Sequence, residues 1–216
     1  GNTNNAIKLG IGMVHQHFTL AENLTVLENI IIGRQSIFSL SLPKRQARTK
    51  ILELSKKFGL PIDPDELVTN LSVSEKQRIE ILKTLFLDCK LLILDEPTAA
   101  LTPQETDALF STIRNMVKAG LSVILISHKL HEILAVSDRI IVLRNGACVG
   151  ETDTNSADRE KIAEMIVGKK IDYPQKTKIP RKSKVLSLID VSYNKTDAPN
   201  LSAVNLNLYG GQILGI

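Results

Sequence analysis

Apolar residues follow two alternating patterns along the first three quarters of the chain. Short aliphatic runs over residues 91–97 and 121–128 are typical of buried strands. Other segments carry apolar residues on one helical face, as over residues 46–58, where Ile51 and Leu54 lie among lysines. This alternation predicts an α/β core.

Capping residues predict where several of the helices begin. Thr25 with Glu28, and Ser72 with Glu75, have the spacing of a capping box, in which the side chain and backbone of each residue bond the other. They predict helices over residues 24–33 and from residue 71 onward. The other expected elements are a short strand that runs into a polar turn over 12–18, a helix from Thr102 to Gly120, a short helix over 129–136, a hairpin turning at Asn145–Gly146 and a helix over 156–167.

Composition divides the chain into three parts. Residues 1–170 form the α/β region, with a largely helical insertion over about residues 20–88. Residues 171–184 are rich in Lys and Pro, which is typical of a linker. Residues 185–216 read as strands and predict a partial antiparallel β region, with the chain stopping inside the last strand.

Composition and charge exclude some classes of protein. No apolar run approaches the roughly 20 residues of a membrane-spanning helix. The net charge of +4 comes from mixed basic and acidic residues, so charge alone does not indicate nucleic-acid binding. Cys89 and Cys148 are far apart and outside any metal-type spacing, so we interpret them as ordinary thiols.

Polar residues at strand ends are the strongest candidates for chemistry. Asp95 and Glu96 follow a buried strand, His128 follows the next, and Gln16 follows the short strand near the start. Open α/β sheets bind ligands at this edge, where one carboxylate could hold Mg²⁺ and the other activate a water. Each residue also has an ordinary alternative: solvated charges, a helix-start histidine and a polar loop residue.

The helix start at Ser72 has two interpretations. Free N–H groups and the helix dipole can hold a phosphate there. The Ser72 hydroxyl can equally be occupied by its own backbone, and local evidence favours that capping role. The 216 residues contain no G-x-x-x-x-G-K-[ST] motif, so this sequence carries no P-loop to cradle phosphates.

Four motifs in order are more specific than any one of them. They are Gln16, LSVSEKQR, LLILDEPTAAL and ISH. Together they resemble the nucleotide-binding domain of ABC transporters, and most closely the tandem-domain ATPases of bacterial importers for simple sugars and nucleosides. The resemblance covers almost the whole chain and implies a P-loop NTPase-like (RecA-like) core sheet with an inserted helical subdomain.

The resemblance implies a role for each strand-end residue. Gln16 is similar to the Q-loop glutamine, which reaches Mg²⁺ and the attacking water. Asp95 is similar to the Walker B aspartate that holds Mg²⁺, and Glu96 to the catalytic base. His128 is similar to the switch histidine that contacts the γ-phosphate of ATP.

The signature motif departs from its usual form. Ser72, Val73, Ser74 and Glu75 occupy the positions that the resemblance implies for binding ATP on a partner domain. Ser74 stands where the family usually has Gly, and Glu75 where it has Gln. Ser74 adds a side chain and Glu75 a negative charge near the expected phosphate.

The implied function is an ATP-binding and ATP-hydrolysing subunit that energises import of a simple sugar or nucleoside. The implied cofactors are ATP and Mg²⁺. The implied partners are integral membrane permease subunits, a second nucleotide-binding domain of the same chain and, indirectly, an extracytoplasmic solute-binding protein, with no nucleic acid. The location would be the cytoplasmic face of the cell membrane.

The ends of the sequence predict a piece of a longer protein. The first P-loop is expected before residue 1 and the second after residue 216, so we expect this piece alone to be inactive. Residues 185–216 could also pack back onto the sheet of the first domain.

Two alternatives remain: a soluble ABC ATPase of DNA repair or translation, and a non-enzymatic interaction module. The ordinary helical insertion, without a long coiled-coil arm, favours the importer.

Overall fold

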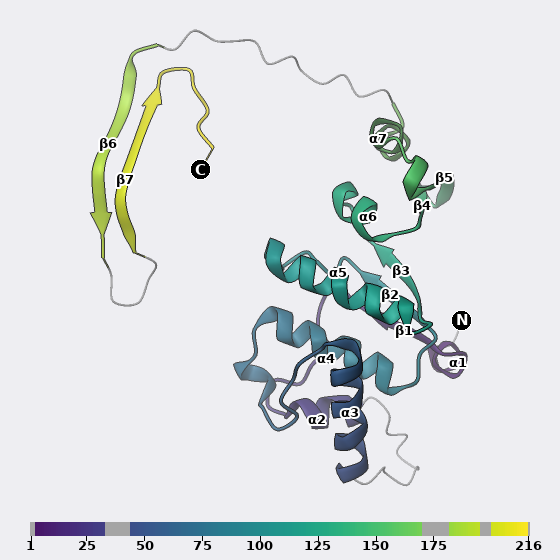
Figure 1. Cartoon of the computed structure of the whole chain (residues 1–216). Coiled ribbons are helices and arrows are strands. Elements are labelled where there is room, and N and C mark those ends of the chain that lie inside the picture. Colours follow the sequence, from purple (N-terminus) through teal and green to yellow (C-terminus); the bar gives the residue numbers. More distant parts are fainter. Residues whose placement is uncertain (1–2, 33–43, 170–181, 195–199, 216) are drawn as a thin grey trace. The chain divides into compact units, whose positions relative to one another are not determined.

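The computed structural model describes residues 3–32, 44–169, 182–194 and 200–215. The chain divides into two compact units, residues 1–170 and 171–216, and each is described by itself (Figure 1). Most of the expected linker lies outside the described residues. The expected packing of the second unit onto the first stays a prediction.

A parallel sheet lies at the centre of the first unit. Its strands are β1 (Ile11–Val14), β2 (Leu91–Asp95) and β3 (Ser122–Ile126), in the order β1-β2-β3. The helix α5 (Pro103–Lys118) connects β2 to β3 and packs against β3 (Figure 1). The predicted strands and the α/β core are therefore present.

The segment between β1 and β2 is helical. It contains α2 (Val26–Ile32), α3 (Lys44–Phe58), the 3-10 turn η1 (Val68–Asn70) and α4 (Val73–Phe86). Ser72 caps α4 in a complete capping box, as predicted. A further short helix, α1 (Thr3–Lys8), precedes β1 and was not predicted.

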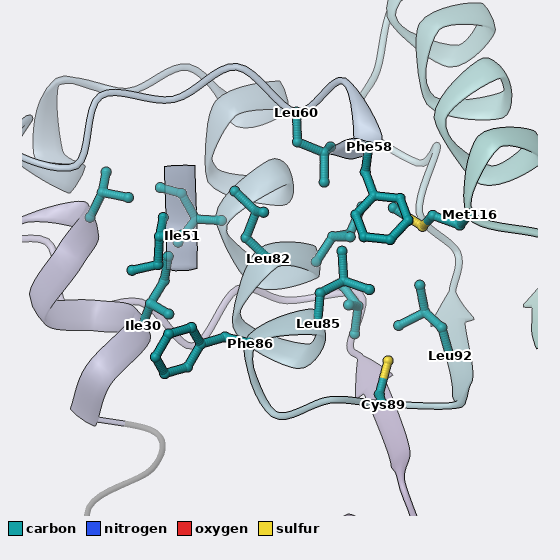
Figure 2. Close-up of a cluster of buried hydrophobic side chains, with 14 of the residues drawn as sticks. Ile30, Ile51, Phe58, Leu60, Leu82, Leu85, Phe86, Cys89, Leu92 and Met116 are labelled. Carbon is teal, nitrogen blue, oxygen red and sulfur yellow. The ribbon is translucent and has the colours of Figure 1, made fainter. Parts of the chain in front are cut away.

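The main core joins these helices to the sheet (Figure 2). Ile30 of α2, Ile51 of α3 and Leu82 of α4 are among its fully buried side chains. Leu92 of β2 and Met116 of α5 extend the same cluster to the sheet and its connecting helix. Burial of aliphatic side chains from α2–α5 and the sheet holds the end of β2 at a fixed place relative to α4.

A smaller layer completes the first unit. It consists of α6 (Leu130–Val136), β4 (Arg139–Arg144), β5 (Ala147–Asp153), η2 (Thr154–Ser156) and α7 (Arg159–Val167). β4 and β5 pair antiparallel through the predicted turn, where Asn145 and Gly146 both have positive φ, as a two-residue type I′ hairpin requires. Ile140, Val142 and Ile162 form a second small core beneath the hairpin.

Two predictions about the first unit are wrong in detail. β3 was expected to be a buried strand, but Ile124 and Ile126 are 47% and 45% exposed. β3 is an edge strand of the described sheet, and α5 packs against it. Burial alternates along the strand, so one of its faces is covered and the side chains on the other face remain exposed. The last helix begins at Arg159 rather than at residue 156, because Asp158 accepts the N–H groups of its first turn.

The second unit is an antiparallel hairpin of β6 (Lys184–Tyr193) and β7 (Leu201–Tyr209). This pairing agrees with the predicted antiparallel region. The expected strand at the end of the chain is absent from residues 212–215, which follow a turn at Gly210–Gly211. Ile213 is 99% exposed. Within this described unit, β7 pairs only with β6, and no other strand is present for residues 212–215.

The two cysteines lie in contrasting surroundings. Cys89 is buried in the main core, and burial raises the pKa of its thiol. Cys148 is exposed on β5. They are both free thiols, as predicted. None of the helices in the described ranges is long and apolar enough to cross a membrane.

Candidate functional site

The carboxyl ends of β2 and β3 bring Glu96 and His128 together. His128 Nδ1 lies 2.9 Å from Glu96 Oε1. Gln16, in the loop after β1, donates from Nε2 to Glu96 Oε2 at 3.4 Å. The side chains of Gln16 and His128, which follow two other strands, therefore both contact the Glu96 carboxylate. They meet it at the edge where open α/β sheets bind ligands.

The backbone holds Glu96 at a sharp turn. Its N–H donates to the carbonyl of Ile126 at 2.9 Å, which fastens it to the end of β3. Its φ is +46°, in the left-handed region that costs a residue with a Cβ roughly 1–2 kcal/mol. The N–H of Ala99 bonds back to the Glu96 carbonyl at 3.2 Å and closes the turn. The Glu96 side chain is thus fixed by its own backbone and by two neighbours.

Asp95 is the last residue of β2 and pairs with Ile126 in the sheet register. Its side chain is half-buried, and no hydrogen bond or ion pair to it occurs within the described part of the chain. A free carboxylate at this edge has the hard oxygen atoms that Mg²⁺ prefers. The described residues contain no group of three or more His, Cys, Asp or Glu side chains arranged for a metal. A Mg²⁺ shared with phosphates needs only one or two carboxylates.

A pocket of about 220 Å³ opens beside these residues. It is lined by residues from three places: the loop after β1, the start of α4 and the loop after β2. These are Val14, His15, Gln16, His17, Phe18, Val73, Gln77, Glu96, Pro97, Ala99, Ala100 and Leu101. Of the four signature positions, only Val73 lines it. Ser72, Ser74 and Glu75 do not.

The Ser72 side chain is engaged in capping. Its hydroxyl donates to Glu75 Oε2 at 2.7 Å, and its N–H donates to the same oxygen at 2.9 Å. These two bonds hold the pKa of the Glu75 carboxyl below its usual range. Ser74 Oγ lies 3.3 Å from Ser72 Oγ. The local capping interpretation is therefore confirmed, and the carboxylate of Glu75 is the group that accepts the hydrogen bond from the Ser72 hydroxyl.

Two residues of α4 that sequence reasoning missed hold the loops of the site. Buried Gln77 donates from Nε2 to the carbonyl of Pro97, next to Glu96, at 2.6 Å. Buried Glu80 accepts the N–H and the hydroxyl of Thr19, in the loop of Gln16, at 2.7 and 2.9 Å. The only signal in the sequence is that these two polar residues, three positions apart, lie among the apolar residues of the helix that follows Ser72.

Comparison with known proteins places this geometry in a family. The family model described as ABC transporter matches residues 2–99, the segment that contains Gln16, the start of α4 and Glu96. The chain belongs to the ABC transporter family. The match agrees with the resemblance found from the motifs.

Two relatives align with nearly all of this ABC family chain. The nucleoside import ATP-binding protein NupA of Lactococcus lactis is 41% identical over 213 residues, which cover 98% of this chain and 42% of that protein. The glucose import ATP-binding protein TsgD13 of Haloferax volcanii is 39% identical, over 98% of this chain and 44% of that protein. The chain therefore spans less than half the length of either relative.

Solved structures show the same fold. An ATP-binding cassette of an ABC transporter in its ADP conformation has a TM-score of 0.65 and 23% identity, over 78% of this chain and 72% of that one. A nucleotide-free cassette has a TM-score of 0.62 and 21% identity, over 78% of this chain and 68% of that one. The predicted fold class, a P-loop NTPase-like core with inserted helices, is confirmed.

Proposed function

We propose that this chain is part of an ATPase subunit that energises ABC-type import of a simple sugar or nucleoside. The observation that carries the proposal is the meeting of Gln16 and His128 on the Glu96 carboxylate at the edge of the parallel sheet. The relatives named for nucleoside and glucose import support the transported class. They also favour the importer over a soluble ATPase of DNA repair or translation.

In the proposed reaction a water attacks the γ-phosphorus of ATP, and the bond from that phosphorus to the bridging oxygen of the β-phosphate breaks, so that ADP leaves. Glu96 accepts a proton from that water as general base, and the Gln16 amide orients it. The His128 imidazole bonds a γ-phosphate oxygen, held in place by its contact with Glu96. Asp95 and Gln16 would hold Mg²⁺, which supplies positive charge to offset that of the phosphates.

The signature residues have a proposed role on a second site. Ser72, Val73, Ser74 and Glu75 would meet an ATP held by another nucleotide-binding domain. The exposed start of α4 supports this role, since Ser72 and Val73 face solvent. The Ser72 hydroxyl would need to break its hydrogen bond to the Glu75 carboxylate in order to donate to a phosphate.

The proposed organisation follows the same scheme. Residues 1–170 are part of a first nucleotide-binding domain, residues 171–184 a linker and residues 185–216 the first strands of a second domain of the same chain. Permease subunits in the membrane are the direct partners, and an extracytoplasmic solute-binding protein acts through them. We place the protein at the cytoplasmic face of the membrane, with no nucleic acid bound.

The test uses the full-length protein assembled with its permease subunits in lipid vesicles. Glu96→Gln should lower ATP hydrolysis at least about a hundredfold, because it removes the general base while keeping the size of the side chain. Glu53→Gln makes the same change at an exposed position of α3 and should leave the rate unchanged. Hydrolysis that survives Glu96→Gln would overturn the proposal.

A further inference from the structure

A buried carboxylate on α6 lies behind the proposed catalytic loops. Glu132 is 3% exposed, and its Oε2 accepts the hydroxyl of Thr98 at 2.5 Å. Thr98 is itself only 1% exposed and lies two residues after Glu96. This oxygen is therefore fixed to the loop that follows β2, next to the proposed base.

The same carboxylate is fixed to the loop that follows β3. Ser127 donates to Glu132 Oε2 at 3.4 Å, and the ammonium of Lys129 lies 3.1 Å from Oε1. Ser127 and Lys129 are the two residues on either side of His128. Lys129 also donates to the carbonyl of Thr98 at 3.1 Å, so it contacts both loops itself.

These contacts join the two loops on both sides of the proposed site. On the front, the exposed imidazole of His128 lies 2.9 Å from the half-buried carboxylate of Glu96. At the back, the buried side chain of Glu132 joins the buried hydroxyl of Thr98 to the two half-buried residues that flank His128. A buried charge and a buried hydroxyl without partners are costly, so the rear contacts favour a single arrangement of the two loops.

The helix that carries Glu132 begins directly after the second loop, with Lys129 as its N-cap residue. This helix, α6, packs through Leu130 and Ile133 onto the small core beneath the hairpin of β4 and β5. The carboxylate is therefore presented from a helix that is joined to the second loop and also anchored in the small core. Each loop is braced against this element as well as against the other loop.

We propose that Glu132 is a positioning residue that sets the distance between His128 and Glu96. This inference rests on the proposed function, because it assigns Glu132 to the same reaction. Glu132 touches neither substrate nor the reacting atoms and acts through the backbone of the two loops. Displacement of a catalytic group by about 1 Å can cost roughly a hundredfold in rate, so a modest loosening is enough to be measured.

The experiment compares variants of the full-length protein assembled with its permease. Glu132→Gln keeps the size of the side chain and removes the charge that Lys129 contacts. Thr98→Val removes the hydroxyl at nearly constant volume and tests the same network from the other end. Glu53→Gln is the matched control, at an exposed position without a described partner. The rate of ATP hydrolysis is divided by the amount of nucleotide that the sample binds, measured with a fluorescent analogue. Because misfolded protein binds no nucleotide, this ratio, called kcat per bound nucleotide, describes only the folded protein.

Glu132→Gln and Thr98→Val should each lower kcat per bound nucleotide about tenfold, with the KM for ATP within about twofold of wild type. The double variant should lose about tenfold rather than a hundredfold, since both changes release the same pair of loops. A purely structural role would lower the amount of bound nucleotide and leave kcat per bound nucleotide unchanged.

Two results would overturn the inference while leaving the proposed function intact. One is a wild-type value of kcat per bound nucleotide in both single variants. The other is a double variant whose loss is the product of the single losses. If the wild-type protein hydrolyses no ATP at all, the proposed function fails, and the role of Glu132 in that reaction fails with it.

Discussion

The bond from Gln77 to Pro97 offers a direct test of how α4 supports the site. Gln77 is 4% exposed, and its Nε2 lies 2.6 Å from the Pro97 carbonyl oxygen. Pro97 is also buried, and no other donor to this carbonyl occurs within the described ranges. Gln77→Met keeps the length and approximate volume of the side chain but has no N–H to donate. The variant therefore isolates the hydrogen bond from the packing.

The magnitude follows from the burial of the acceptor. A hydrogen bond between two uncharged groups contributes a net ~0.5–1.5 kcal/mol, but a buried carbonyl left without a donor costs ~1–3 kcal/mol. Gln77 and Pro97 also line the pocket of about 220 Å³, from which water can approach the carbonyl, so we take the middle of this range rather than its upper end. We therefore expect Gln77→Met to lower the free energy of unfolding by about 2 kcal/mol.

Urea unfolding followed by circular dichroism measures this loss on residues 1–216. Gln46→Met is the matched control, because Gln46 is exposed on α3 and such substitutions usually change stability by less than about 0.5 kcal/mol. A loss for Gln77→Met no larger than that of the control would refute the reasoning. It would mean that the Pro97 carbonyl is solvated or that α4 does not hold this loop.

Three further predictions concern helix starts and turnover. Thr102→Ala removes the hydroxyl that caps α5 and should cost about 1 kcal/mol in thermal unfolding, whereas Thr102→Ser should retain most of the stability. The bonds from Ser72 lower the pKa of Glu75 below its ordinary value of 4.5, so their stabilisation is fully present above pH 4.5 and is lost as the pH falls through the folded-state pKa. Urea midpoints on both sides of that pH should fall more steeply for wild type than for Glu75→Gln. Residues 1–216 alone should release phosphate from ATP no faster than the same chain with Glu96→Gln, since this sequence has no P-loop motif. A faster rate in the unmodified chain would contradict this.

Local chemistry explains why much of the fold could be predicted. The capping boxes at Ser72 and Thr102 and the Asn145–Gly146 turn depend on neighbours within three residues, so the sequence pattern contains all of the interacting groups. The meeting of Glu96 with His128 was also predictable, because parallel strands end at one edge of a sheet.

Features that depend on distant contacts could not be predicted in this way. Gln77 bonds a carbonyl 20 residues away, and Glu132 bonds a hydroxyl 34 residues away. In sequence, both are simply polar residues within helices. The solvent-exposed side of β3 and the missing strand at residues 212–215 likewise depend on which neighbours are present. An apolar run indicates a tendency to form a strand but does not identify what will pair with it or cover it.

The contrast between the two cysteines makes Cys148 a natural attachment point for a probe. Cys89 has a shielded thiol with a raised pKa, while Cys148 is exposed on β5. A maleimide dye or spin label should therefore modify Cys148 selectively in the folded, unaltered chain. The label would sit on the hairpin that packs with α6, the helix carrying Glu132. Changes in its mobility or fluorescence would then report movements of this layer in real time without any engineered residue.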